Sequence, residues 1–356
     1  MDALKVAVDA PSGLNTETGV AHDDCFFADH TITMFAKKTG MFLKDGIDVC
    51  GEIYKACLGA PDSIVQDIAR IKVIGEEDPP FMMPFRFRRS TKFDYGRVLV
   101  VAGSENMPGA AALASNASIS TGAGLVYLFT PNVHSAVLPE VIPTKVQTTE
   151  EGTISKYSLE NILDAAKKVD VIAMGPGFGD NIETIGLVRE LIERVPDSVS
   201  LVIDADALRA VDTSSTLRKN IILTPHTGEF AKMIDVPREE VENHPHNLAK
   251  RWARKLNCII HLKYVPSIIT DGDDTYWNIN GNPGMATAGC GDVLTGMIAS
   301  LIAQGIKPLR ASALAAFLHS LAGDWYAINY GEETLTASKM IEALRIVMSK
   351  NIWELD

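Results

Sequence analysis

Short segments that are apolar throughout, separated by helix-prone stretches, recur along the chain from residue 98 onward. A strand without a polar face must be buried on both sides, and parallel sheets covered by helices on both faces have such strands. We therefore predict an α/β fold with a mostly parallel sheet and right-handed crossovers. The segments lie at 98–102, 125–129, 171–174, 201–203, 221–223, 258–262 and 267–270.

The part of the chain before residue 91 has a different pattern. Residues 1–62 contain three strand candidates, at 6–8, 30–35 and 52–58, but no strong helix. So little chain cannot easily bury a core alone, and we interpret this block as the end of a larger α/β domain, a partial Rossmann-like segment. Residues 63–90 are rich in proline and basic residues and are predicted to be a linker, followed by the main domain at 91–350.

Composition limits the partners that this chain can bind. The 356 residues are 46% apolar and 22% charged, which predicts a folded core, and carry a net charge of −12. This charge argues against binding to nucleic acid or an anionic membrane, but backbone amides could still hold a phosphorylated ligand. The five cysteines form no C-x-x-C pair, and no apolar stretch is long enough to span a bilayer. We expect reduced thiols in a cytoplasmic protein.

Small and polar residues follow four of the predicted strands. Ligands of open α/β sheets bind outside the carboxyl ends of the strands, so these segments predict a ligand site at one edge of the sheet. They are Gly-Ser-Glu-Asn at 103–106, Gly-Pro-Gly-Phe-Gly-Asp at 175–180, Asp-Ala-Asp-Ala-Leu at 204–208 and Thr-Pro-His-Thr-Gly-Glu at 224–229.

A run of small residues then leads into an apolar helix that we expect to start at about Asp292, with one buried face. The run is Ala288, Gly289, Cys290 and Gly291. A loop of this kind at a helix N-terminus presents free amides and the positive end of the helix dipole, which suits a phosphoryl group in transfer. Asp292 could be a helix cap or a general base. The adjoining anion hole favours the base.

Several motifs, in the same order, resemble the ribokinase-like family of ADP/ATP-dependent NAD(P)H-hydrate dehydratases. The resemblance covers about residues 90–345 and implies a three-layer ribokinase-like sandwich. The motifs are Gly-Ala-Ala-Ala-Leu at 109–113, Gly-Pro-Gly-Phe-Gly at 175–179, Asp-Ala-Asp-Ala-Leu at 204–208, Thr-Pro-His-Thr-Gly-Glu-Phe at 224–230 and the signature segment at 282–296.

The resemblance implies a specific repair reaction. ADP or ATP, with ADP expected from similarity to bacterial members, would drive dehydration of the S epimer of hydrated NADH or NADPH, and Mg²⁺ would accompany the nucleotide. Asp292 would be the catalytic residue, beside the anion hole of residues 288–291. Positions matching the hydrate site are Ala110, Gly177, Gly179, His226 and Asp292; those matching the nucleotide site are Lys263, Tyr264, Val265, Pro266, Ser267 and Gly291. We also expect a homo-oligomer.

Four residues differ from the family's usual pattern, namely Ala288, Cys290, Tyr264 and Thr227. Ala288 would be strained if its position required a positive φ. Two other functions therefore stay open: a ribokinase-like kinase of a stable alcohol, and a non-catalytic sensor of adenine nucleotides.

The first block resembles the end of an NAD(P)H-hydrate epimerase domain. Asp9 matches a substrate-binding position of that family, and Ser12 lies near its potassium site. The front half of that domain has no counterpart in this chain. We therefore predict no epimerase activity from it.

Overall fold

The computed structural model describes residues 3–59, 64, 69, 71–75 and 83–349. The chain divides into two compact units, Met1–Lys72 and Val73–Asp356. Parts of the predicted linker, at 63, 65–68, 70 and 76–82, lie outside the described residues.

The smaller unit contains a three-stranded parallel sheet in the order β1-β2-β3. Its strands are β1 (Val6–Val8), β2 (His30–Met34) and β3 (Glu52–Ala56), close to the three predicted positions. A 3-10 helix, η1 (Thr39–Phe42), and the short α1 (Gly46–Val49) follow β2. The core of this unit is small and is formed by Cys25, Met41, Val49 and Cys50.

A ten-stranded sheet forms the centre of the larger unit, counting the described residues. It is parallel from β11 through β10, β9, β8, β5 and β6 to β7, whereas β12 and β13 are antiparallel, so the prediction of a mostly parallel sheet is confirmed. In spatial order the strands are β4 (Lys72–Val73), β13 (Thr275–Asn278), β12 (Ser267–Thr270), β11 (Ile259–Leu262), β10 (Ile221–Leu223), β9 (Ser200–Ile203), β8 (Val171–Met174), β5 (Arg97–Val101), β6 (Leu125–Thr130) and β7 (Val141–Lys145).

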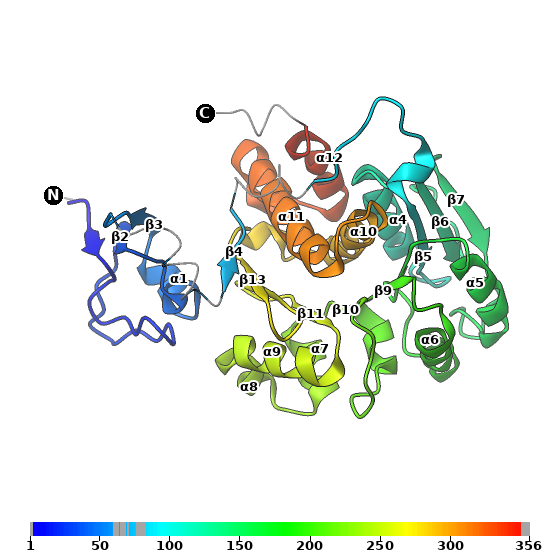
Figure 1. Ribbon diagram of the computed structural model, residues 1–356, viewed down its shortest axis with the longest axis horizontal. Helices are drawn as coiled ribbons and strands as arrows, with labels where there is room; N and C mark the ends of the chain where they lie inside the picture. The colour runs from blue at the N-terminus through cyan, green and yellow to red at the C-terminus, as the bar shows by residue number, and fades with distance from the viewer. Residues whose placement is uncertain (1–2, 60–63, 65–68, 70, 76–82, 350–356) are drawn as a thin grey trace. The chain divides into compact units, whose positions relative to one another are not determined.

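Helices cover both faces of this sheet and complete a three-layer sandwich (Figure 1). One layer contains α4 (Pro108–Ser120), α10 (Cys290–Ala303), α11 (Pro308–Tyr330) and α12 (Ala337–Val347). The other contains α5 (Leu159–Ala166), α6 (Ile182–Arg194), α7 (Thr227–Ile234), α8 (Arg238–Asn243) and α9 (Pro245–Leu256). The 3-10 helices are η2 (Lys92–Tyr95), η3 (Lys156–Ser158), η4 (Ala205–Ala210), η5 (Pro283–Met285) and η6 (Glu332–Thr334).

Helix α10 differs from its prediction in two respects. It begins at Cys290 rather than at Asp292, and it is buried all round from Val293 to Ala303 rather than on one face. The helix packs between the sheet, α4 and α11, so even its polar residues face protein. At Gly296 a Cβ would lie 2.1 Å from the carbonyl oxygen of Ala114, so glycine there lets α10 and α4 approach closely.

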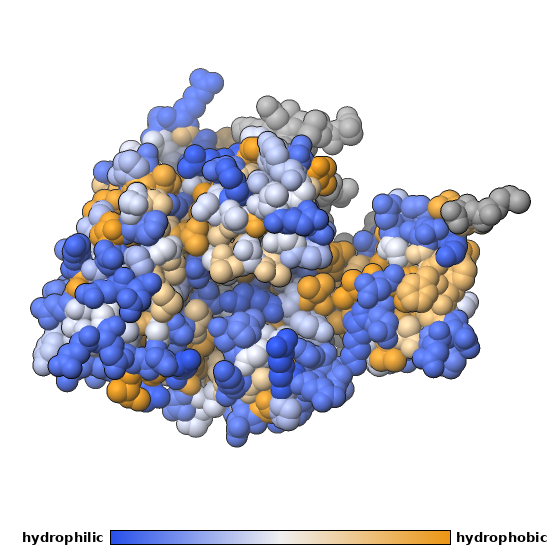
Figure 2. Space-filling model, turned by 180° about the vertical axis from the view of Figure 1, so that it is seen from behind, coloured by the Kyte–Doolittle hydropathy of each residue, from blue (hydrophilic) through white to orange (hydrophobic). Residues whose placement is uncertain are grey.

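The outside of the larger unit is mainly polar, with scattered apolar residues (Figure 2). Within the described ranges, no helix has both the length and the apolar character needed to cross a bilayer. All five cysteines are free, as expected.

Candidate active site

The small-residue loop before α10 leaves backbone amides available at the N-terminus of the helix. Gly289 is the N-cap residue and has φ +92°, a conformation that favours glycine. The amide of Cys290 is 3.4 Å from the carbonyl oxygen of Thr287, but the amides of Gly291 and Asp292 donate to no residue that the structure describes. Free amides at the positive end of a buried helix attract anions.

Ala288 is exposed and is not among the residues with positive φ. The strain that a positive φ would impose on alanine is therefore absent. The loop places its left-handed residue at Gly289, so the departure from the family pattern at position 288 has no conformational cost.

Asp292 lies in the first turn of α10, where its carboxyl group is half-buried. Burial, together with the nearby negative charges of Asp204 and Asp206, raises its pKa to about 7, against the opposing effect of Lys263. A carboxyl group of this kind is ionised in part of the population at neutral pH and can accept a proton there.

Asp204, which directly follows β9, is 1% exposed and has three hydrogen-bond donors around its carboxylate. Its Oδ1 accepts hydrogen bonds from Thr224 Oγ1 and Lys263 Nζ, each at 2.7 Å, and its Oδ2 accepts one from Thr295 Oγ1 at 2.8 Å. Burial opposes ionisation, but the ammonium group of Lys263 and these hydrogen bonds hold the pKa of Asp204 below its usual value. This carboxylate links the ends of β9, β10 and β11 to α10.

Lys263 follows β11, and its amide donates to the carbonyl of Pro225 at 2.8 Å, beside His226. Although burial lowers its pKa, the carboxylates of Asp204 and Glu229 outweigh that effect and raise it. The lysine is therefore charged, with its ammonium group at the N-terminus of α10.

His226 is the N-cap residue of α7, immediately after β10. Its Nδ1 accepts from the amides of Gly228 and Glu229 at 3.0 and 3.3 Å, while the carboxylate of Glu229 accepts from the amide of His226. The ring therefore caps the helix through Nδ1, while Nε2 lies 3.5 Å from Glu229 Oε1. Because the cap uses Nδ1, the predicted contact with substrate would have to use the rest of the ring.

Two of the predicted hydrate-binding positions are in contact. A Cβ at Gly177 would lie 3.0 Å from the Cβ of Ala110, which is in the first turn of α4. One turn further along α4, Leu113 reaches within 2.5 Å of a Cβ built at Gly289. The glycine loop after β8 therefore adjoins the anion hole through α4.

The backbone of Gly179 is anchored by the side chain of Asp206. Its amide donates to Asp206 Oδ2 at 2.8 Å, and Asp206 is one of the charges that influence Asp292. The structure thus brings Ala110, Gly177, Gly179, His226 and Asp292 around one edge of the sheet, where four strand ends meet.

The predicted nucleotide segment after Lys263 approaches α8 at Tyr264. Tyr264 is half-buried, and its pKa is raised by burial and by Glu242 of α8. Val265 is exposed, whereas Pro266 is buried, and the Ser267 hydroxyl donates to the carbonyl of Tyr264 at 3.2 Å. A nucleotide contacting this segment would extend from α10 toward α8.

Two contacts at the site were not anticipated from the sequence. The carboxylate of Asp204 was identified only as part of a polar strand end, without its partners. His319 was interpreted as a core or helix-face residue, and it is buried on α11, but its Nε2 also contacts the carbonyl oxygen of Cys290 at 3.0 Å. Burial lowers the pKa of His319 to about 4, so the ring is neutral and donates this hydrogen bond.

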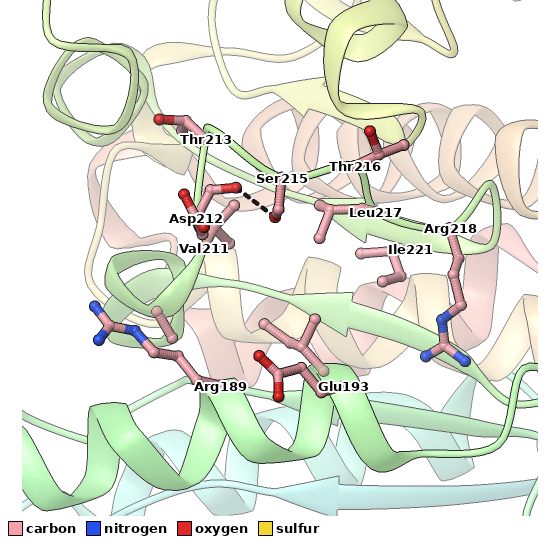
Figure 3. Close-up of a pocket in the computed structure, with 12 residues that line it drawn as sticks. Arg189, Glu193, Val211, Asp212, Thr213, Ser215, Thr216, Leu217, Arg218 and Ile221 are labelled. Atoms are coloured by element: carbon pink, nitrogen blue, oxygen red, sulfur yellow. Dashed lines mark hydrogen bonds between the residues drawn. The ribbon is translucent and has the colours of Figure 1, made fainter.

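A cavity of about 660 Å³ lies elsewhere in the larger unit and contains none of these residues. It lies between Arg189 and Glu193 of α6 and the loop 211–218, and it reaches Ile221 at the amino end of β10 (Figure 3). The candidate site follows the carboxyl end of the same strand. The cavity is therefore at the opposite end of the sheet.

Comparison with known families gives two matches. A family model described as NAD(P)H-hydrate dehydratase matches residues 98–345, and one described as YjeF-related protein N-terminus matches residues 1–40. Among relatives, the bifunctional NAD(P)H-hydrate repair enzymes Nnr of Moorella thermoacetica and Thermofilum pendens are each 36% identical to this chain. Each alignment covers 96% of this chain and 66% of the relative, so the chain spans slightly less than two thirds of their length.

Solved structures have the same fold. The ADP/ATP-dependent NAD(P)H-hydrate dehydratase from Bacillus subtilis, co-crystallised with ATP/Mg²⁺, is 30% identical to this chain with a TM-score of 0.66. The alignment covers 78% of this chain and 97% of that one. A ribokinase-like superfamily protein from Enterococcus faecalis is 26% identical with a TM-score of 0.70, covering 80% of this chain and 96% of the other.

Proposed function

Because the chain belongs to the NAD(P)H-hydrate dehydratase family, we propose that it uses ADP or ATP to dehydrate the S epimer of hydrated NADH and NADPH. The reaction would restore the reduced nicotinamide ring. The single observation that best supports this chemistry is the position of Asp292, a carboxyl group with pKa raised to about 7 beside two free helix amides.

The reaction requires a base and a site for the transferred phosphoryl group. Asp292 would take the proton from the hydroxyl group of the hydrate while the hydroxyl oxygen attacks the terminal phosphorus of the nucleotide, and the bond from that phosphorus to the leaving AMP (from ADP) or ADP (from ATP) breaks. The amides of Gly291 and Asp292 would stabilise the charge on the phosphoryl oxygens. Loss of phosphate and of the neighbouring ring proton would then regenerate the double bond.

The hydrate would bind at the carboxyl ends of the strands, between Ala110, Gly177, Gly179 and His226. Gly177 and Gly179 have φ values of +69° and +77°, and the lack of a side chain leaves their backbone accessible. The nucleotide would lie along Lys263, Tyr264, Val265, Pro266 and Ser267. These assignments follow the resemblance of the motifs, and the proximity of the segments supports them.

Magnesium would reach this site only with the nucleotide. Among the described residues, no group of three or more His, Cys, Asp or Glu side chains could hold a metal ion. The described residues therefore do not fit a resident metal, whereas Mg²⁺ shared with phosphate oxygens and water needs no such group. Bound in that way, the ion would neutralise phosphate charge.

The test is to incubate the protein with hydrated NADH and ADP or ATP and to follow the absorbance of reduced nicotinamide. Recovery of NADH with release of AMP or ADP supports the dehydratase, and the faster nucleotide identifies the physiological donor. A stable phosphorylated product would instead support a kinase. Nucleotide binding without turnover would support a sensor.

A further inference from the structure

Lys263 has hydrogen-bonding capacity that no described residue uses. A lysine ammonium group has three donors, and one of them goes to Asp204 at 2.7 Å. No other acceptor contacts it within the described part of the chain. A Cβ at Gly291 would lie 3.4 Å from Lys263 Nζ, so the ammonium group is beside the free amides of α10.

The charges around this position are mostly negative. Asp292 and Asp206 interact with each other, and Glu229 acts on Lys263 from α7. A nucleotide would bring further negative charge to the same place. Lys263 supplies a positive charge there, and a charge-assisted hydrogen bond to a phosphoryl oxygen would use its remaining donors.

The side chain of lysine is flexible, so a fixed position needs a partner. Asp204 is that partner, and it is itself immobile, because it is buried and bonded to Thr224 and Thr295. Without its carboxylate, the ammonium group would be drawn toward Asp292, with which it also interacts. An ion pair between them would occupy the base and remove the cation from the nucleotide.

We propose that Asp204 is a positioning residue that holds the ammonium group of Lys263 against the terminal phosphoryl group of a bound nucleoside diphosphate or triphosphate. Lys263 thereby becomes the cationic part of the anion hole, in addition to the amides of Gly291 and Asp292. The inference rests on the proposed function for the reaction, but nucleotide binding alone tests the contact.

The first experiment measures binding of ADP and AMP by calorimetry without the hydrate. We expect the intact protein to bind ADP more tightly than AMP. In Lys263→Gln the ratio of the two affinities, the ADP preference, should fall roughly 10- to 100-fold. Asp204→Asn should lose a similar amount although Lys263 is still present, and the double variant should lose no more than Lys263→Gln alone. Equal ADP preference in Asp204→Asn and the intact protein would overturn the proposal, as would additive losses.

Should Asp204→Asn not fold, Asp204→Glu keeps the charge and moves it by one methylene. A partial loss of the ADP preference is then expected, and an unchanged preference contradicts the positioning role. Ser118→Ala is the matched control, because Ser118 Oγ is a buried anchor of α10, 2.9 Å from the carbonyl oxygen of Gly296, without any charge. It should lower the melting temperature but leave the ADP preference unchanged.

The second experiment follows the acid limb of kcat/KM against pH. Asp204 raises the pKa of Asp292 and Lys263 lowers it. The limb should therefore move to lower pH in Asp204→Asn and to higher pH in Lys263→Gln, opposite shifts that a purely structural role would not produce. Shifts in one direction overturn the proposal. If the intact protein binds ADP but never restores NADH, the proposed function fails while the binding experiment still decides the role of Lys263.

Discussion

At the scale of single residues, one carboxyl group of the site has a pKa near neutral pH, whereas another is fully ionised at that pH. Asp204 and Asp292 interact, yet the pKa of one is lowered and that of the other is raised. The difference arises because Asp204 has Lys263 and two threonines as partners, whereas Asp292 accepts no hydrogen bond from any described side chain. Two carboxyl groups with opposite shifts are typical of acid–base sites.

We predict that Asp292→Asn abolishes recovery of NADH, leaves ADP binding nearly intact and stabilises the fold. The carboxyl pKa rises on folding from 3.8 to about 7, so ionised Asp292 destabilises the folded state. The gain in the variant should be absent below pH 4, grow as pH rises through about 7, and reach at most about 4 kcal/mol. Thermal unfolding of both proteins across this pH range checks it. Normal turnover by Asp292→Asn would remove Asp292 as the base.

The intact enzyme should also lose kcat/KM below about pH 7, because the base must be unprotonated to accept a proton. A pH–rate profile measured at saturating and at low hydrate concentration tests this. An acid limb near pH 4, the ordinary range of a carboxyl group, would show that the surroundings of Asp292 do not raise its pKa in solution.

The sequence indicated the residues that could act but not how they are paired. Asp292 and the small-residue run were recognisable because a cap residue and free amides are local features. The pair of Asp204 and Lys263 joins residues 59 positions apart, through the adjacency of β9, β10 and β11. Strand order, which sets this pairing, is not a local property of the sequence.

At the scale of elements, the shape of the loop before α10 depends on glycine at one position and not at its neighbour. A Cβ at Gly289 would lie 2.5 Å from Leu113 Cδ1 and 3.0 Å from Ala337 Cβ, in addition to the strain of φ +92°. Gly289→Ala should therefore lower stability by about 1–2 kcal/mol and greatly reduce turnover. The matched change Ala288→Gly, at an exposed position without a positive φ, should alter stability little. An equal loss of stability in both variants would contradict this account of the loop.

Helix α7 offers a second test, because His226 caps it and is also predicted to contact the hydrate. His226→Ala removes the cap and should cost about 1 kcal/mol, whereas His226→Asn retains a capping residue. If the ring also contacts substrate, both variants should raise KM for the hydrate, and only His226→Ala should lower the melting temperature. An unchanged KM in His226→Asn would limit the residue to capping.

The central strands were predictable because they are mostly aliphatic, and β8, β10 and β12 match their predicted bounds. Three strands of the larger sheet were missed. Strand β7 is an edge strand that contains Pro143 and is mostly exposed, β4 has only two residues, and β13, Thr275–Asn278, has aromatic rather than aliphatic residues between its polar ends. None has the continuous aliphatic pattern of a central strand.

At the scale of the whole molecule, the two units differ in how well their sheets are covered. The larger sheet has helices on both faces (Figure 1). In the smaller unit, alternate residues of β1 and β2 face a small core, with Ala7, Thr31 and Thr33 buried. The residues between them are apolar and exposed, including Val8 at 64% and Ile32 at 40%. Parallel sheets rarely leave one face open to water.

An apolar face of this kind predicts that the chain self-associates as its concentration rises. Sedimentation velocity over a wide concentration range should show species larger than the monomer. The double variant Val8→Lys, Ile32→Lys adds two charges to the exposed apolar face. Because a contact between two copies of the chain would have to remove these charges from water, the variant should shift the distribution of species toward the monomer. Thr18→Lys, His22→Lys adds two lysines at exposed polar positions of the same unit and should leave the distribution unchanged. Monomers at every concentration, or equal effects of both variants, would mean that this face does not drive association.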